Sequence, residues 1–297
     1  MKRRAFLFGC AWLVISLTGA QADTTPEPLS NQAPAPAQRV AVLDWGLAET
    51  LLGLGITPLA VAELDNYQRW VAVPEMPESV HDLGLRTEPN LELLAQLDPD
   101  LILITPQFEG ARAKLSRIAP VVSLAIYQPD GDAYANAQSV TRQLGRLTGQ
   151  QAQAEALIAS VNNQLLRLRE RLAGRPIPPL FIAAFIDDRH VRVFGRQSLF
   201  DAVLQRVGLA NAWTGADNFW GFAQAGIEQL AEPAEAGLIR LRPLPLNAER
   251  RLASSVLWAN LPFVRASRVY DFPPTWQFGG LVSASRFASL LGDALDD

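Results

Sequence analysis

The most regular hydrophobic pattern lies near the middle of the chain, at residues 150–173. This stretch contains no Gly or Pro and is dominated by Ala, Leu, Gln, Glu and Arg, which are strong helix formers. Apolar residues recur there at intervals of three or four, at Leu157, Val161, Leu165, Leu168 and Leu172. That spacing places them on one face of a helix. The pattern predicts a rigid linking helix, about 36 Å long at 1.5 Å per residue.

The patterns on either side of residues 148–174, the predicted linking helix, alternate short apolar runs with helical stretches. Apolar runs at 40–43 and 58–62 flank a helical pattern, and a β-α-β unit of this length indicates two parallel strands. The runs at 180–185 and 191–194 predict a hairpin. An ordinary long core helix is the alternative to a linker. No element is predicted for residues 242–251.

These patterns together predict an α/β fold of two lobes joined by a single long helix, with a ligand cleft between the lobes. The N-terminal lobe is expected at residues 39–147 and the C-terminal lobe at 175–297. Thr148 and Gln151 have the spacing of a capping box at the start of the linking helix.

The first residues have the features of an export signal. A basic start is followed by an apolar run at 5–18 and by Ala20-Gln21-Ala22, which is typical of a cleavage site. We expect residues 1–22 to be a signal peptide cleaved after Ala22, and residues 23–38, rich in Pro, Ala and polar side chains, to be a disordered leader. The adjacent arginines also resemble a twin-arginine signal, so the export route stays open. The expected compartment is the periplasm.

Composition excludes several classes of site. The formal net charge is −4, and removal of the three basic residues of the signal would lower it to −7, which disfavours nucleic-acid binding. The single cysteine, Cys10, lies in the predicted signal, so the mature chain would have no disulfide or thiolate site. Only His81 and His190 could act as imidazole bases, and both fall in expected turns or loops. No catalytic motif is present, so neither an enzyme, a cofactor nor a metal site is predicted.

Aromatic residues cluster in predicted loops that follow strands. Loops at strand ends are where α/β folds bind ligands, and many aromatic side chains there indicate an apolar pocket with few polar anchors. Trp213, Phe219 and Trp258 are expected instead to fill the interiors of the lobes. The main polar candidate is Arg86, because a guanidinium offers a planar fork of donors to paired oxygens.

Five segments carry a resemblance to a known family. They are GLRTEPNLELL (84–94), DNYQRWV (65–71), VFGRQSLF (193–200), NFWG (218–221) and WANLPFVRA (258–266). In combination they resemble periplasmic ferric hydroxamate siderophore-binding proteins, a helix-linked family of binding proteins, over residues 39–297. The resemblance implies a monomer that delivers iron(III)–hydroxamate complexes to an inner-membrane ABC permease.

The resemblance also implies which residues bind the ligand. Arg86 matches the arginine that contacts the hydroxamate oxygens. The remaining residues implied in ligand binding are Trp70, Phe108, Asn218, Trp220, Phe222, Trp276 and Phe278. Phe108 and Phe278 stand where better-known members have tyrosine, so they are expected to make apolar contacts only. Phe222 replaces a smaller residue and is expected to narrow the cleft.

Two glutamates, Glu92 and Glu228, lie in early turns of short predicted helices, one in each half of the chain. In the wider family such glutamates dock on arginines of the transporter, although a solvated carboxylate is also favoured at a helix start. A carrier for another iron chelate, haem or cobalamin is an alternative function. An exported enzyme is a third, which would need a carboxylate as its base.

Overall fold

Two five-stranded sheets organise the chain, one in each half of the sequence. The computed structural model describes residues 35–129 and 131–296. The first sheet has the order β3-β2-β1-β4-β5, and all its strands are parallel. Its strands are β1 (Val40–Val42), β2 (Ala60–Val61), β3 (His81–Asp82), β4 (Leu101–Ile104) and β5 (Val121–Ser123). The predicted parallel pair of β1 and β2 is therefore confirmed, with Ala41 opposite Ala60.

Short helices connect these strands, because parallel neighbours need a crossover connection. They are α1 (Trp45–Gly53), α2 (Leu64–Trp70), α3 (Leu91–Gln96), η1 (Pro106–Ala111) and α4 (Arg112–Leu115). Asp44 caps α1, since its side chain accepts a hydrogen bond from the Leu47 N–H. Strands β1, β2 and β4 are each followed closely by a helix, whereas longer loops follow β3 and β5.

The second sheet is mixed, in the order β10-β9-β6-β7-β8. Its strands are β6 (Leu180–Phe185), β7 (His190–Phe194), β8 (Phe222–Gly226), β9 (Gly237–Leu241) and β10 (Val269–Phe272). Strand β7 runs antiparallel to both β6 and β8, so the predicted hairpin is confirmed, with Phe185 opposite Val191. The helices of this half are α7 (Leu199–Val207), η2 (Ile227–Ala231), α8 (Ala248–Ser254), α9 (Val256–Asn260) and α10 (Pro262–Arg265).

The long helix is α6 (Gln151–Leu172), and the residues of its apolar stripe from Val161 onward are buried. The predicted capping box does not form. Gln150 is the N-cap without a side-chain hydrogen bond, and the Thr148 hydroxyl donates to the Leu144 carbonyl instead, at 2.6 Å. Thr148 therefore ends the preceding helix, α5 (Ala133–Leu147), rather than starting α6.

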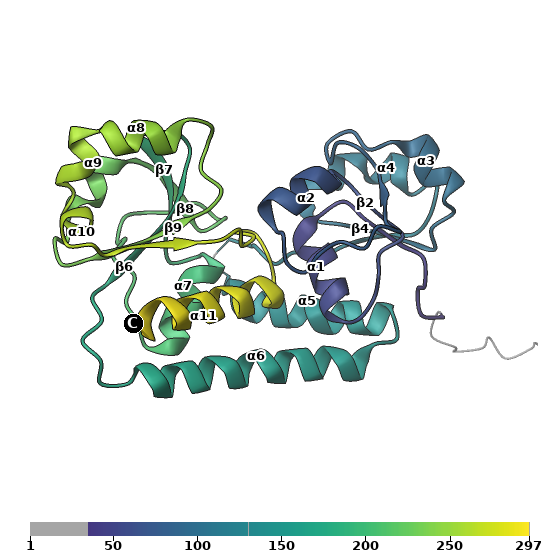
Figure 1. Cartoon of the computed structure of the whole chain (residues 1–297). Helices are drawn as coiled ribbons and strands as arrows, with labels where there is room; N and C mark the ends of the chain where they lie inside the picture. Colours follow the sequence, from purple (N-terminus) through teal and green to yellow (C-terminus); the bar gives the residue numbers. More distant parts are fainter. Residues whose placement is uncertain (1–34, 130, 297) are drawn as a thin grey trace, which may run out of the picture. The chain divides into compact units, whose positions relative to one another are not determined.

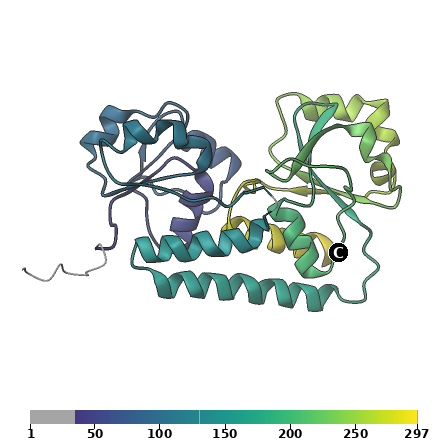
Figure 2. The same ribbon diagram turned by 180° about the vertical axis from the view of Figure 1, so that it is seen from behind.

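Helix α6 does not join the two lobes alone. It packs against α5, α7 and α11 (Leu281–Asp296), and α11 also contacts α1 of the first lobe. These helices lie together on one side of both sheets (Figures 1 and 2). One hydrophobic cluster includes Val42 of β1, Leu165 of α6, Ile182 of β6 and Phe287 of α11. The predicted fold class is confirmed. The two lobes are held together by a shared apolar core in addition to the covalent connection of the chain.

No helix in the described ranges is long and apolar enough to cross a membrane. The predicted signal peptide lies outside the described residues, as does most of the predicted leader.

Candidate functional site

A cleft lies between the two lobes at the C-terminal ends of the parallel strands. Its main cavity has a volume of about 480 Å³. The cavity is lined by Asp44, Glu63, Arg86, Thr87, Gln107, Phe108, Arg192, Trp220, Phe222, Trp276 and Phe278. A smaller adjoining cavity of about 260 Å³ is lined mainly by apolar groups, including Ile126, Tyr127 and Phe219. Because both lobes contribute side chains, the cleft can contact a ligand from two sides.

Arg86 is held at the N-terminal wall by a polar network. The backbone N–H and the Nε of Arg86 both donate to the Glu63 carboxylate, at 3.2 and 3.1 Å. Its guanidinium also lies over the buried Trp45 ring, 3.8 Å from the centroid. Neither terminal nitrogen of Arg86 has a hydrogen-bond partner within the described chain. Both terminal NH2 groups of a fixed guanidinium therefore remain available in the cleft.

The loop that carries Arg86 is fixed in turn by Asp82. The Asp82 carboxylate accepts the N–H groups of Glu63, Leu64 and Gly84, at 3.1, 3.3 and 2.9 Å. Glu63 has a φ of 57°, in the left-handed region that non-glycine residues rarely adopt. Such conformations persist where surrounding contacts over-determine them, often at ligand sites. The three acceptor contacts of Asp82 explain how this one persists.

Aromatic rings form a continuous row of contacts from one wall of the cleft to the other. Trp276 lies 4.8 Å from Trp45 and 5.3 Å from Phe278, measured between ring centroids. Phe278 in turn lies 5.4 Å from Trp220 and 5.9 Å from Phe222. Aromatic faces of this kind bind apolar ligand surface with little loss of side-chain entropy. The ring nitrogen of Trp276 is buried without a partner in the described residues.

The segment that carries Trp276 and Phe278 is fastened to the first lobe through α1. Glu49 of α1 is fully buried and accepts hydrogen bonds from the N–H groups of Gly280 and Ser283 and from the Ser283 hydroxyl, at 2.8, 3.2 and 2.7 Å. The Tyr127 hydroxyl donates to the Gly279 carbonyl, at 3.2 Å. A side chain at Gly279 would collide with Glu49 and Ser283, so this close approach requires glycine.

Burial dominates the electrostatics of these carboxylates. Desolvation raises the pKa of Glu49 to about 7, although the Ser283 hydroxyl and the two backbone donors oppose the shift. Burial also raises the pKa of Asp44, against the opposing effects of the Leu47 N–H and the Arg86 charge. The pKa of the Tyr127 hydroxyl is raised by burial, so this group stays a neutral donor.

Six of the eight predicted ligand-binding residues line the main cavity: Arg86, Phe108, Trp220, Phe222, Trp276 and Phe278. The other two do not. Trp70 is half-buried at the edge of the core, with the Arg69 guanidinium 5.6 Å from its ring centroid. Asn218 is exposed, and its side chain accepts the N–H groups of Trp220 and Phe222, at 2.9 and 3.3 Å. Asn218 thus shapes the turn that presents two cleft aromatics.

The structure changes one expectation about aromatic packing and adds residues that sequence reasoning missed. Phe219 was expected in the interior, but it is 43% exposed and lines the smaller cavity, because it follows Asn218 in a turn at the cleft rim. Trp213 is half-buried and Trp258 is buried, and both pack in a hydrophobic cluster of the second lobe. Five residues line the main cavity without having been predicted: Asp44, Glu63, Thr87, Gln107 and Arg192. Glu63 and Gln107 follow β2 and β4, so their position after a strand was the available signal.

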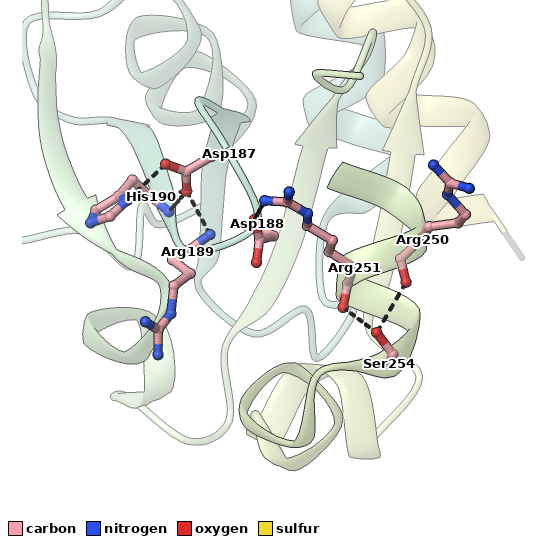
Figure 3. A network of polar contacts seen from close by, with 7 residues as sticks. All are labelled: Asp187, Asp188, Arg189, His190, Arg250, Arg251 and Ser254. Atoms are coloured by element: carbon pink, nitrogen blue, oxygen red, sulfur yellow. Dashed lines mark hydrogen bonds and ion pairs between the residues drawn. The ribbon is translucent and has the colours of Figure 1, made fainter. Parts of the chain in front are cut away.

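The two predicted docking glutamates are exposed in short helices of separate lobes. Glu92 lies in the first turn of α3, which is capped by Asn90, and Glu228 lies in the first turn of η2. Beside Glu228, the β6–β7 turn is closed by Asp187, which accepts the N–H groups of Arg189 and His190 and contacts the His190 ring (Figure 3). Arg251 pairs with Asp188 across the same surface. His190 is therefore engaged in a turn, while His81 lies on the exposed strand β3.

No group of three or more His, Cys, Asp or Glu side chains in the described part of the chain is arranged to hold a metal ion. The cleft instead presents aromatic faces, a fixed guanidinium and a second arginine, which suits a ligand whose polar atoms are already organised.

Comparison with known proteins gives consistent matches along most of the chain. A sequence model of the periplasmic binding protein family matches residues 40–275. The iron(3+)-hydroxamate-binding protein FhuD of Escherichia coli is 35% identical over 258 residues, covering 86% of this chain and 86% of that protein. The Fe(3+) dicitrate-binding periplasmic protein FecB of the same organism is 26% identical and covers 96% of this chain and 93% of its own.

Solved structures match as well. The Fe3+–Desferal-bound siderophore-binding protein FhuD from Vibrio cholerae has a TM-score of 0.82 and 34% identity, covering 87% of this chain and 97% of that one. The triscatecholate siderophore-binding protein FeuA from Bacillus subtilis has a TM-score of 0.73 at 17% identity, covering 89% of this chain and 94% of that one, and so shows a likeness of fold alone.

Proposed function

The chain belongs to the periplasmic binding protein family, and we propose that it binds iron(III)–hydroxamate siderophores in the cleft between its lobes. In this proposal the protein is a binding protein of an ABC importer, without catalytic activity or a cofactor of its own. It delivers the loaded siderophore in the periplasm to the inner-membrane permease. The ferric chelate is the cargo, and its iron is coordinated by the siderophore.

One observation carries the proposal: a guanidinium fixed by Glu63 and Trp45 faces a cavity that is also lined by five aromatic side chains. A ferric hydroxamate complex presents oxygen atoms around a metal centre that is already fully coordinated. The free terminal nitrogens of Arg86 match those oxygens, and the rings match the apolar chain of the siderophore. The similarity to the hydroxamate-binding protein of Escherichia coli, at 35% identity, supports the same ligand class.

The charges in the cavity also favour hydroxamates over tris-catecholates. Arg86 and Arg192 are offset in part by Glu63 and Asp44, so the lining has no strong excess of positive charge. A tris-catecholate complex carries roughly three negative charges and would call for a cluster of basic residues. In our proposal Trp220, Phe222, Trp276, Phe278 and Phe108 make apolar contacts, whereas Asn218 and Trp70 act by supporting the walls.

The remaining roles follow from the same proposal. Residues 1–22 act as the export signal, 23–38 as a leader, 39–147 and 175–297 as the two lobes, and 148–174 as their link. Glu92 and Glu228 dock on the permease, one from each lobe, and the protein acts as a monomer. Their exposure on separate lobes supports a contact that spans both lobes at once.

The test is a titration of tryptophan fluorescence with ferrichrome and ferrioxamine. We expect quenching, because Trp220 and Trp276 line the cavity. Arg86→Ala should weaken binding by about tenfold or more, through loss of charge-assisted hydrogen bonds. Arg146→Ala, an exposed arginine of α5, is the matched control and should bind as the parent does. Absence of quenching by every ferric hydroxamate in a panel would overturn the proposal.

A further inference from the structure

The main cavity contains two arginines with different surroundings, one from each lobe. Arg86 is paired with Glu63, at 3.1 Å between Nε and the carboxylate. Arg192 of β7 has no ion-pair partner within the described chain, and its Nε is buried without a hydrogen-bond partner there. Buried polar atoms are normally satisfied, and an unsatisfied one in a cavity requires an explanation.

The position of Arg192 is fixed by the sheet. It lies in a strand between β6 and β8, opposite Ala184 and Gln224. Its guanidinium lies 5.4 Å from the centroid of Phe222, a ring of the same cavity. The backbone is held on both sides, so the half-buried guanidinium is presented to the cavity by a rigid element.

The charges of the two walls therefore differ. The N-terminal wall holds Arg86 together with the carboxylates of Glu63 and Asp44. The part of the lining contributed by the second sheet and its turns holds Arg192, Trp220 and Phe222, and includes no carboxylate. A negatively charged group on a bound ligand would consequently be favoured at the C-terminal wall, beside Arg192.

From this asymmetry we propose that Arg192 binds a carboxylate of the ligand, and that the preferred cargo is a ferric hydroxamate complex that carries at least one such carboxylate. The inference rests on the proposed function. In a simple tris-hydroxamate complex the ligand charges cancel the charge of iron(III), so a neutral complex would leave Arg192 unpaired. A complex with an additional carboxylate supplies the planar pair of oxygens that a guanidinium fork matches.

The test compares two probes on the same protein variants by fluorescence titration. One probe is ferrichrome, a neutral complex, and the other is the ferric complex of a citrate-derived dihydroxamate, which carries carboxylate charge. The parent protein should bind the carboxylate-bearing complex more tightly. Arg192→Gln should weaken the binding of that complex by about tenfold and change the binding of ferrichrome by less than about twofold. Arg192→Lys keeps the charge but loses the planar fork of donors, so its affinity for the carboxylate-bearing complex should lie between those of the parent and of Arg192→Gln.

Arg189→Gln is the matched control, because Arg189 is exposed in the turn of the same hairpin. It should leave the binding of both probes unchanged, and thermal melts should show all variants folded. Equal weakening of both probes by Arg192→Gln would overturn the inference, since Arg192 would then act only on closure or packing. So would equal affinity of the parent for the two probes. If neither probe binds the parent, the proposed function itself fails.

Discussion

The two walls of the cleft are built in different ways. On the N-terminal wall the polar side chains follow parallel strands: Asp44 follows β1, Glu63 follows β2, Arg86 and Thr87 follow β3, and Gln107, in η1, follows β4. On the C-terminal wall, Arg192 and Phe222 lie within antiparallel strands. The first wall follows the general rule that open parallel sheets bind ligands at the carboxyl ends of their strands. The second departs from it, because the hairpin of β6 and β7 presents the face of a strand.

The difference separates a fixed anchor from an adaptable surface. The N-terminal wall fixes Arg86 through Glu63 and Asp82, so its geometry is determined before a ligand arrives. The C-terminal wall has aromatic rings and one arginine, which has no ion-pair partner in the described residues and whose Nε has no hydrogen-bond partner there. We infer that the first wall recognises what all ligands share and the second distinguishes among them.

The largest expected effect concerns the core that holds both walls together. Leu165→Ala should lower the free energy of unfolding by about 2 to 5 kcal/mol, because Leu165 is 3% exposed in the cluster shared by the lobes. Leu166→Ala, the adjacent residue at 54% exposure, should change it by less than about 0.5 kcal/mol. Denaturant unfolding measures both. Similar values for the two variants would contradict a core shared through α6.

The second effect concerns Glu49, which fastens the Trp276–Phe278 segment to α1. Its folded pKa is about 7, above its ordinary value of 4.5, so the folded state retains the proton more strongly than the unfolded state. This contribution to stability is fully present below pH 4.5 and is lost as the pH rises towards 7, an effect on the order of 3 kcal/mol. Asp44, whose pKa is also raised, acts in the same direction.

Glu49→Gln removes this titrating group. Unfolding measured between pH 4.5 and 7.5 should show a flatter dependence of stability on pH for the variant than for the parent. Parallel curves for the two proteins would show that Glu49 does not titrate in this range.

The smallest expected effect compares the supports of the two walls directly. Asp82→Ala removes a charged acceptor for three backbone N–H groups, so the affinity for any ferric hydroxamate should fall by about tenfold. Asn218→Ala removes a neutral acceptor for two such groups, and the loss should be about threefold. Isothermal titration calorimetry on both variants measures these two losses of affinity. A larger loss of affinity for Asn218→Ala than for Asp82→Ala would contradict the assignment of the N-terminal wall as the fixed anchor.

The sequence predicted the elements that depend on local pattern. The spacing of apolar residues located α6, the loop after a predicted strand located Trp276 and Phe278, and the family resemblance located Arg86. It could not locate Arg192, because an arginine between Val191 and Val193 has the pattern of an ordinary solvent-facing strand position. Nor could it find the contact of Glu49 with Ser283, whose partners are 234 residues apart and meet only when α11 packs on α1.

The most direct measurement of the central claim is anomalous diffraction from crystals grown with a ferric hydroxamate. We predict an iron peak in the cleft, with ligand oxygens at the terminal nitrogens of Arg86 and with Trp220 and Trp276 against the siderophore. An iron peak elsewhere on the protein, or coordinated directly by its side chains, would contradict the account.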